Sequence, residues 1–261
     1  MIKRRNKFWK ICLQIFIFAI MMKLISVNVL AEPAFPIPKL GLNMEPATNP
    51  KDAAASIQIL LILTVLALAP SILIMMTSFT RIIIILSFLR NALGTQQMPP
   101  NQVLIGLSLF LTLFIMTPVG TDINKNAFEP FSKGEITQQV AMDKSSASIK
   151  NFMLKQIRSE KDLALFVSLS GIQTPVKPEE LPLTVVIPAF LINEMTIAFK
   201  IGFLIYIPFL IIDMVVSSTL MSMGMMMLPP VMISLPFKIL LFIMVGGWNL
   251  ISQSIINSFI R

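Results

Sequence analysis

Four long apolar stretches follow one another along the chain, and polar segments separate them. They cover residues 57–76, 103–119, 185–220 and 231–251. A helix needs about 20 apolar residues to cross the hydrocarbon of a bilayer, because each residue adds about 1.5 Å. The pattern therefore predicts an all-α integral membrane protein. It would consist of two helical hairpins, residues 57–119 and 188–261, with a small helical periplasmic domain at 120–187 between them.

The N-terminus carries a signal for export. Five basic residues precede its first apolar run: Lys3, Arg4, Arg5, Lys7 and Lys10. That run, residues 11–22, is short, and small residues precede Glu32. This is the pattern of a secretory signal peptide over residues 1–31, cleaved between Ala31 and Glu32. The alternative is an uncleaved anchor helix, which Lys23 disfavours because it cuts the apolar run short.

Cleavage sets the predicted orientation of the spans. The tail, residues 32–56, stays in the periplasm, and its prolines predict irregular structure. The first span then enters the cytoplasm, where Arg81 and Arg90 fit the excess of basic residues in cytoplasmic loops. The second span returns, so residues 120–187 are exported. The turn that follows the third span is again cytoplasmic.

The exported segment has helix signals of its own. Ser132 with Glu135 matches a capping box, and Ser159 is a candidate start for another helix that Gly171 ends. Four apolar residues between these signals recur at helical spacing: Ile149, Phe152, Met153 and Ile157. So small a domain has a modest core. We therefore expect its apolar faces to pack against sister copies.

Composition and charge narrow the possible functions. Hydrophobic residues make up 55% of the chain, charged residues 13%, and mean hydropathy is +0.81, as in membrane proteins. The net charge of +8 suggests a nucleic-acid partner at first sight. However, six of the 21 basic residues lie in the signal peptide, which leaves 15 basic against 13 acidic residues. We therefore expect no nucleic-acid partner.

Catalytic chemistry has few candidates in this sequence. Cys12 is the only cysteine and lies in the signal peptide, and the chain has no histidine. The mature chain thus lacks a thiol nucleophile, an imidazole base and the usual ligands of zinc, haem and iron–sulfur clusters. We expect no cofactor, no metal and no enzymatic activity. An intramembrane enzyme is disfavoured because Glu194, Asp213 and two lysines have no nucleophile beside them.

A methionine-rich turn joins the third and fourth apolar stretches. Its methionines are Met223, Met225, Met226 and Met227, and its helix breakers are Gly224, Pro229 and Pro230. Methionine is flexible and polarizable, so a cluster can repack around objects of different shape. Irregular backbone at membrane depth persists only inside protein or along a cavity. The cluster therefore predicts a pore constriction; the alternative is that these methionines fill gaps between helices.

A similar set of breakers occurs at the earlier turn between the first two stretches. Gly94, Pro99 and Pro100 have the spacing of Gly224, Pro229 and Pro230. Repeated hairpins are common in transport proteins. A chance match is the alternative, since glycine and proline are the usual breakers.

Four charged residues interrupt the third and fourth stretches: Glu194, Lys200, Asp213 and Lys238. A charge in hydrocarbon costs roughly 2.5–3.5 kcal/mol on insertion scales. These side chains should therefore face a bundle interior, pair with an opposite charge or line water. Glu194 and Lys200 are too far apart in sequence to pair along one helix, so partners come from another segment or another chain. Alternatively, Glu194 and Lys200 lie at the membrane interface.

Several longer blocks resemble one known family. They are residues 69–82 (APSILIMMTSFTRI), 90–96 (RNALGTQ), 99–104 (PPNQVL), 208–213 (PFLIID), 223–230 (MGMMMLPP) and 235–238 (LPFK). On these blocks the chain resembles the FliP family of flagellar export-gate proteins, over roughly residues 57–258. One departure is Gly246, where the family usually carries aspartate, so any role of that carboxylate is in doubt here.

The resemblance implies a pore-forming subunit of the flagellar type III protein export gate, in the inner membrane at the flagellar basal body. Several copies would assemble with FliQ and FliR, near FlhA and FlhB, and pass unfolded flagellar subunits across the membrane. It further implies that the methionines form a gasket that seals the channel. Lys238 would pair with an acidic residue of a neighbouring subunit.

Two other functions fit the same features. The related export gate of virulence injectisomes is one; the cleavable signal and the exported domain favour the flagellar branch. The other is a structural scaffold for gate assembly, with the pore formed by other chains. Contact of these methionines with an arrested substrate separates a pore from a scaffold.

Overall fold

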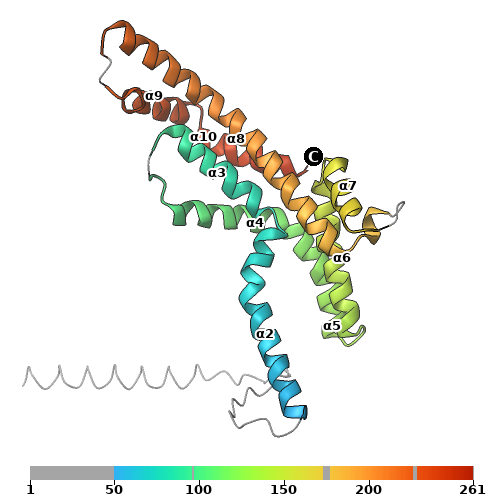
Figure 1. Ribbon diagram of the computed structural model, residues 1–261. Coiled ribbons are helices and arrows are strands. Elements are labelled where there is room, and N and C mark those ends of the chain that lie inside the picture. Colours follow the sequence, from blue (N-terminus) through green and yellow to red (C-terminus); the bar gives the residue numbers. More distant parts are fainter. Residues whose placement is uncertain (1–49, 96, 173–176, 226–227, 261) are drawn as a thin grey trace, which may run out of the picture. The chain divides into compact units, whose positions relative to one another are not determined.

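A computed structural model describes residues 50–95, 97–172, 177–225 and 228–260 (Figure 1). Within these ranges every regular element is helical, which confirms the predicted all-α class. Two helices are long and apolar enough to cross a membrane, and one bent pair of helices makes a third candidate. The prediction of four spans is therefore not confirmed. The signal peptide and its cleavage site, Ala31 and Glu32, lie outside the described residues.

The chain divides into two compact units, residues 1–57 and 58–261. Of the first, the structure describes only the opening turns of helix α2 (Pro50–Met75). Helix α2 contains the predicted first span, but its apolar part, Ile59–Ile72, is shorter than a span needs. Its side chains are exposed around the helix, as Leu60 (64%) and Leu66 (68%) show. Lipid or other chains must therefore surround this helix.

Helix α3 (Phe79–Leu93) lies where the sequence predicted a cytoplasmic loop. Ile82, Ile85 and Leu86 are at most 1% exposed, and the helix packs on both α4 and α8 (Figure 1). Arg81, which the sequence assigned to a cytoplasmic loop, lies instead in this helix, and its side chain is fully buried. The residue belongs to the apolar face of α3, where a charge can persist only if it is paired.

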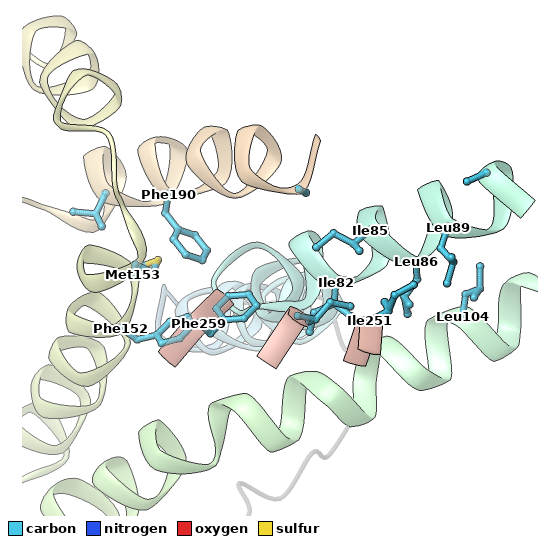
Figure 2. Close-up of a cluster of buried hydrophobic side chains, with 14 of the residues drawn as sticks. Ile82, Ile85, Leu86, Leu89, Leu104, Phe152, Met153, Phe190, Ile251 and Phe259 are labelled. Atoms are coloured by element: carbon cyan, nitrogen blue, oxygen red, sulfur yellow. The ribbon is translucent and has the colours of Figure 1, made fainter. Parts of the chain in front are cut away.

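One hydrophobic cluster joins helices that are far apart in the sequence (Figure 2). Apart from Leu181, which precedes α8, its buried members come from α3, α4 (Asn101–Ile123), α6 (Gln138–Gln156), α7 (Glu160–Leu169), α8 (Leu183–Ser222), α9 (Pro230–Met244) and α10 (Gly247–Ile260). Phe152 and Met153 of α6 belong to this cluster together with Phe190 of α8. The segment predicted as a separate domain thus shares its core with the apolar helices. These two side chains are buried within their own chain and are not available to sister copies.

The segment between α4 and α8 is helical, as predicted, with different boundaries. Helix α4 continues through the π-helical turn η1 (Asn124–Phe128) into α5 (Glu129–Ser132). The predicted capping box is wrong: Ser132 ends α5, and the hydroxyl of Thr137 accepts the hydrogen bond from the backbone N–H of Val140 at the start of α6. The prediction for α7 is confirmed, since it follows Ser159 and ends before Gly171. A short 3₁₀ turn, η2 (Pro178–Glu180), precedes α8.

Helix α8 (Leu183–Ser222) is longer than a simple membrane span. Its 40 residues extend about 60 Å, twice the thickness of the hydrocarbon core. Pro188 and Pro208 lie inside it without ending it. A helix of this length crosses more than the hydrocarbon, so part of α8 must lie in water or in protein.

The fourth apolar stretch is divided between α9 (Pro230–Met244) and α10, which meet at 65°. Gly246 lies in the exposed turn between them with φ +62°, and a Cβ added to it would have no other atom within 4 Å. Glycine adopts this backbone freely, and aspartate is among the few other residues that tolerate it. The departure from the family pattern at Gly246 is therefore compatible with the same turn.

Gly202 allows α8 to approach α3 closely, and this contact yields a testable prediction. A Cβ at Gly202 would lie 2.6 Å from Cγ of Phe88. Gly202→Ala should therefore lower the free energy of unfolding by about 1–3 kcal/mol through overpacking. Gly106→Ala in α4 is the matched control, because nothing lies within 4 Å of its Cβ position. Thermal unfolding in detergent measures both, and equal unfolding temperatures would contradict the prediction.

Candidate functional site

The methionine-rich turn follows α8 in a defined backbone geometry. The backbone N–H of Gly224 donates to the carbonyl of Met221 at 3.1 Å, and that of Met225 donates to the carbonyl of Leu220 at 3.0 Å. With Gly224 at φ +76°, this is a Schellman motif, which ends a helix at a glycine. Pro229 then precedes α9 as its N-cap residue.

The methionines that the structure describes in this turn are exposed. Met223 is 71% exposed and Met225 is 41% exposed. Met226 and Met227 lie outside the described residues. Within this chain the thioethers of Met223 and Met225 thus have little to pack against. They are available to contact something outside the chain.

The earlier turn also begins at a glycine with positive φ and is followed by a proline at the N-cap of the next helix. Helix α3 ends at Gly94 with φ +74°, and Pro100 is the N-cap residue of α4. Gly94 also lies against the second hairpin, since its Cβ position is 3.6 Å from Cγ1 of Val231. The equal spacing of the breakers in the sequence therefore corresponds to two helical hairpin turns at the same end of this unit.

Lys238 connects three helices near these turns. Its Nζ lies 2.6 Å from Oδ2 of Asp213 in α8 and donates a 3.2 Å hydrogen bond to the carbonyl of Ala92 at the end of α3. Ser234 donates to the other carboxylate oxygen of Asp213 at 2.5 Å. A cation at the C-terminus of a helix is favoured by the helix dipole. The side chain of Lys238 is 2% exposed and that of Asp213 is 27% exposed.

A second ion pair, between Arg81 and Glu194, lies fully buried among α3, α6, α8 and α10. Nε of Arg81 donates to Oε2 of Glu194 at 2.8 Å, and Nη2 donates to Oε1, so the pair is bidentate. Both side chains are 0% exposed. The guanidinium also lies 3.7 Å from the centroid of the Phe259 ring, which suits a cation–π contact.

Further hydrogen bonds surround this pair and connect the same helices. Nη1 of Arg81 donates to the carbonyl of Ser258 at 3.0 Å. Gln156 donates to the carbonyl of Phe259 at 3.1 Å, and Asn193 donates to the carbonyl of Gln156 at 2.9 Å. A buried charge is tolerated when its hydrogen-bonding capacity is filled in this way. We refer to Arg81, Glu194, Gln156, Asn193 and Ser258 as the polar hub.

The sequence predicted that the four charged residues of the apolar stretches find partners in another segment or another chain, without naming the partners. Three of the four have partners in this chain: Glu194 pairs with Arg81, and Asp213 pairs with Lys238. Neither pair requires a neighbouring subunit for neutralisation. Lys200 is exposed on α8 and makes no ion pair within the part of the chain that the structure describes.

Sequence reasoning missed most of the polar hub. The charge pattern assigns Arg81 to a loop, and nothing in it draws attention to Gln156 or Ser258. One signal was present: Arg81 stands beside the apolar run 82–86, so a helix there must bury it against an acidic residue. Glu194, with no basic residue three or four positions away, was the available partner.

The site offers little for catalysis or metal binding. Among the described residues no group of three His, Cys, Asp or Glu side chains is close enough to hold a metal ion. The carboxylates of Glu194 and Asp213 each face a basic side chain and lie about 28 Å apart along α8 by helix rise. Their arrangement is that of structural ion pairs.

Most of this sequence matches one family of known proteins. The model of the FliP family fits residues 62–255, which run from α2 into α10 and include both turns and most of the polar hub. The chain belongs to the FliP family. A flagellar biosynthetic protein FliP from Bacillus subtilis (strain 168) is 56% identical over 218 residues, 84% of this chain and 98% of that protein.

Two other FliP proteins are similar over comparable lengths. The flagellar biosynthetic protein FliP of Pectobacterium carotovorum subsp. carotovorum is 51% identical over 84% of this chain and 85% of its own length. That of Treponema pallidum (strain Nichols) is 46% identical over 87% of this chain and 84% of its own length. The likeness to FliP thus extends over nearly the whole of each relative.

Proposed function

We propose that this FliP-family chain is a pore-forming subunit of the flagellar type III protein export gate in the bacterial inner membrane. Several copies, with FliQ and FliR and near FlhA and FlhB, would enclose a conduit for unfolded flagellar proteins. Family membership supports the flagellar role, and the apolar helices support a membrane location. The observation that carries the proposal is the exposure of Met223 and Met225 where α8 ends at Gly224.

The conduit must lie between copies. The interior of the chain is filled by the hydrophobic cluster and the polar hub. The two or three candidate spans among the described residues are too few to surround a water-filled path for a polypeptide. Closed rings of identical subunits are the common solution when one chain cannot enclose a space.

The methionine turn suits a seal at the narrow end of such a conduit. Thioether side chains adapt their shape at low cost, and hydrophobic constrictions exclude ions by dewetting. Because α8 ends at Gly224 in the same way in each copy, Met223 and Met225 of all copies would gather at one level of the conduit. We propose that the seal consists of Met223, Met225, Met226 and Met227.

The remaining topology is part of the same proposal. Residues 120–187, with α6 and α7, would face the periplasm, and the methionine turn would lie toward the cytoplasm. Lys200 is our candidate for charge pairing between copies, because Glu194, Asp213 and Lys238 are neutralised within the chain.

Cysteine crosslinking to an arrested substrate tests the proposal. Cys12 is the only native cysteine, so its replacement gives a background in which Met225→Cys is the single thiol. An export substrate with a folded, blocking domain and one cysteine should form a disulfide with Met225→Cys in cells. Met214→Cys is the matched control, since Met214 is 60% exposed on α8 away from the turn.

Either outcome decides between a pore and a scaffold. A disulfide at Met225→Cys and none at Met214→Cys supports the conduit. A substrate that reacts with neither position, although the complex assembles, would show that other chains form the pore. The chain would then be a scaffold for gate assembly.

A further inference from the structure

Helix α10 carries a narrow stripe of amide side chains opposite its buried face. Gly247, Ile251, Ile255 and Phe259 recur every four residues and are buried. Asn249, Gln253 and Asn257 recur at the same spacing, roughly half a turn away, and are exposed. We call these three residues the amide stripe.

The side-chain amides of the stripe have no hydrogen-bond partner among the described residues. Those of Asn249, Gln253 and Asn257 bond no side chain or backbone group there, although the backbone of all three belongs to the helix. A polar group left unpaired in hydrocarbon costs several kcal/mol. The amide stripe therefore faces water or a polar partner in the assembled protein.

Helix α9 has a different exposed surface, although it belongs to the same bent pair. Its exposed side chains are apolar, such as Phe237 (55%), Leu240 (56%) and Ile243 (68%). That surface suits lipid or an apolar helix. The 65° bend thus separates an apolar arm from an arm whose exposed surface carries the amide stripe beside apolar residues such as Leu250 (58%).

A polar cleft adjoins the amide stripe and enlarges the hydrated surface. It has a volume of about 390 Å³, and Gln253, Ser254 and Asn257 line it together with Arg158. Helix α10 itself carries no charged residue between Gly247 and Ile260. Neutral amides and hydroxyls can both donate and accept hydrogen bonds, and an exposed main chain presents N–H and C=O groups at every residue.

We propose that the amide stripe lines the hydrated part of the export conduit and makes transient hydrogen bonds to the main chain of the polypeptide in transit. This inference rests on the proposed function. Amide groups recognise main-chain groups of any sequence, and α10 itself adds no charge that would hold acidic or basic segments. Arg158, which lines the adjoining cleft, donates a 2.7 Å hydrogen bond to the carbonyl of Ser258. The apolar seal at the methionine turn and the polar wall of α10 then have separate tasks: one excludes ions and the other keeps an unfolded chain solvated.

The test uses the full chain in the assembled complex, without Cys12. Gln253→Cys and Asn257→Cys are each paired with an arrested export substrate that carries one cysteine in its unfolded segment. Both positions are expected to give a substrate-linked band under mild oxidation. Ile243→Cys on the apolar arm is the matched control and is expected to give none.

The outcomes distinguish this inference from the proposed function. If Met225→Cys captures the substrate while both stripe positions link only to sister copies or to nothing, the amide stripe is not part of the conduit wall and the export function stands. If Met225→Cys, Gln253→Cys and Asn257→Cys all fail to capture it, the proposed function fails as well. If Gln253→Cys and Asn257→Cys capture the substrate and Ile243→Cys gives no substrate-linked band, the inference is supported.

Discussion

Replacing Arg81 with alanine should remove most of the folded protein from the membrane. The substitution leaves the carboxylate of Glu194 buried without its partner, and both side chains are 0% exposed. Breaking a buried ion pair from one side costs about 3–5 kcal/mol, a large part of the roughly 5–15 kcal/mol that stabilises a folded protein. The loss also removes the hydrogen bond to the carbonyl of Ser258 that holds α10.

The amount of full-length chain in isolated membranes and its unfolding temperature in detergent measure the effect. Glu194→Ala should act in the same direction, because it leaves the guanidinium unpaired. The double variant Arg81→Met with Glu194→Leu should recover part of the lost stability, since it buries no charge. If the double variant loses less stability than the two single variants added together, the Arg81–Glu194 pair is the cause of the loss.

Arg90→Ala is the control for the loss of an arginine from the same helix. Arg90 is partly exposed and donates a hydrogen bond to the side chain of Asn101. Its replacement should therefore lower the free energy of unfolding by about 1 kcal/mol or less. Normal accumulation of Arg81→Ala, with an unchanged unfolding temperature, would show that the polar hub does not hold these helices together.

Local features of the sequence were sufficient to predict much of this structure. The apolar stretches became helices, even with prolines inside them, because a helix satisfies its backbone hydrogen bonds within one apolar segment. Gly94 and Gly224 end helices because both adopt positive φ. Gly171 follows α7 with positive φ, and Ser159 is the extended N-cap residue that precedes it. Each of these signals acts within a few residues, so it can be recognised without knowledge of the fold.

The interior of the fold could not be predicted in the same way. Arg81 and Glu194 are separated by 113 positions, and neither residue indicates by itself which partner it meets. The sequence used Arg81 only as a basic residue of a cytoplasmic loop, whereas its pairing with Glu194 places it in the core. Phe152 and Phe190 likewise meet only after α6 folds back on α8 (Figure 2).

The two ion pairs give the long helix α8 two fixed points. Glu194 ties it to α3, α6 and α10 through the polar hub, and Asp213 ties it to α9 and the end of α3. The methionine turn follows the second fixed point by about three helical turns. Its position relative to the core is therefore set by Lys238 and Asp213 rather than by the turn itself.

Replacing the methionines of the turn with alanine should make the assembled gate leak small ions. Each substitution removes the sulfur and two carbons of the side chain, so a ring of such residues loses the volume that closes the aperture. Water then enters a constriction that was dry, and ions follow it. The combined variant of Met223, Met225, Met226 and Met227 should show discrete openings in planar bilayers without substrate, where the native gate is closed.

Leucine at the same four positions separates volume from flexibility. Leucine keeps most of the volume but has a branched, stiffer side chain, so the empty gate should stay closed while export of flagellar subunits slows. Met214→Ala and Met244→Ala together are the matched control, because both methionines are exposed (60% and 76%) outside the turn. A silent bilayer record with the fourfold alanine variant, in complexes shown to be intact, would mean that the seal lies elsewhere in the assembly.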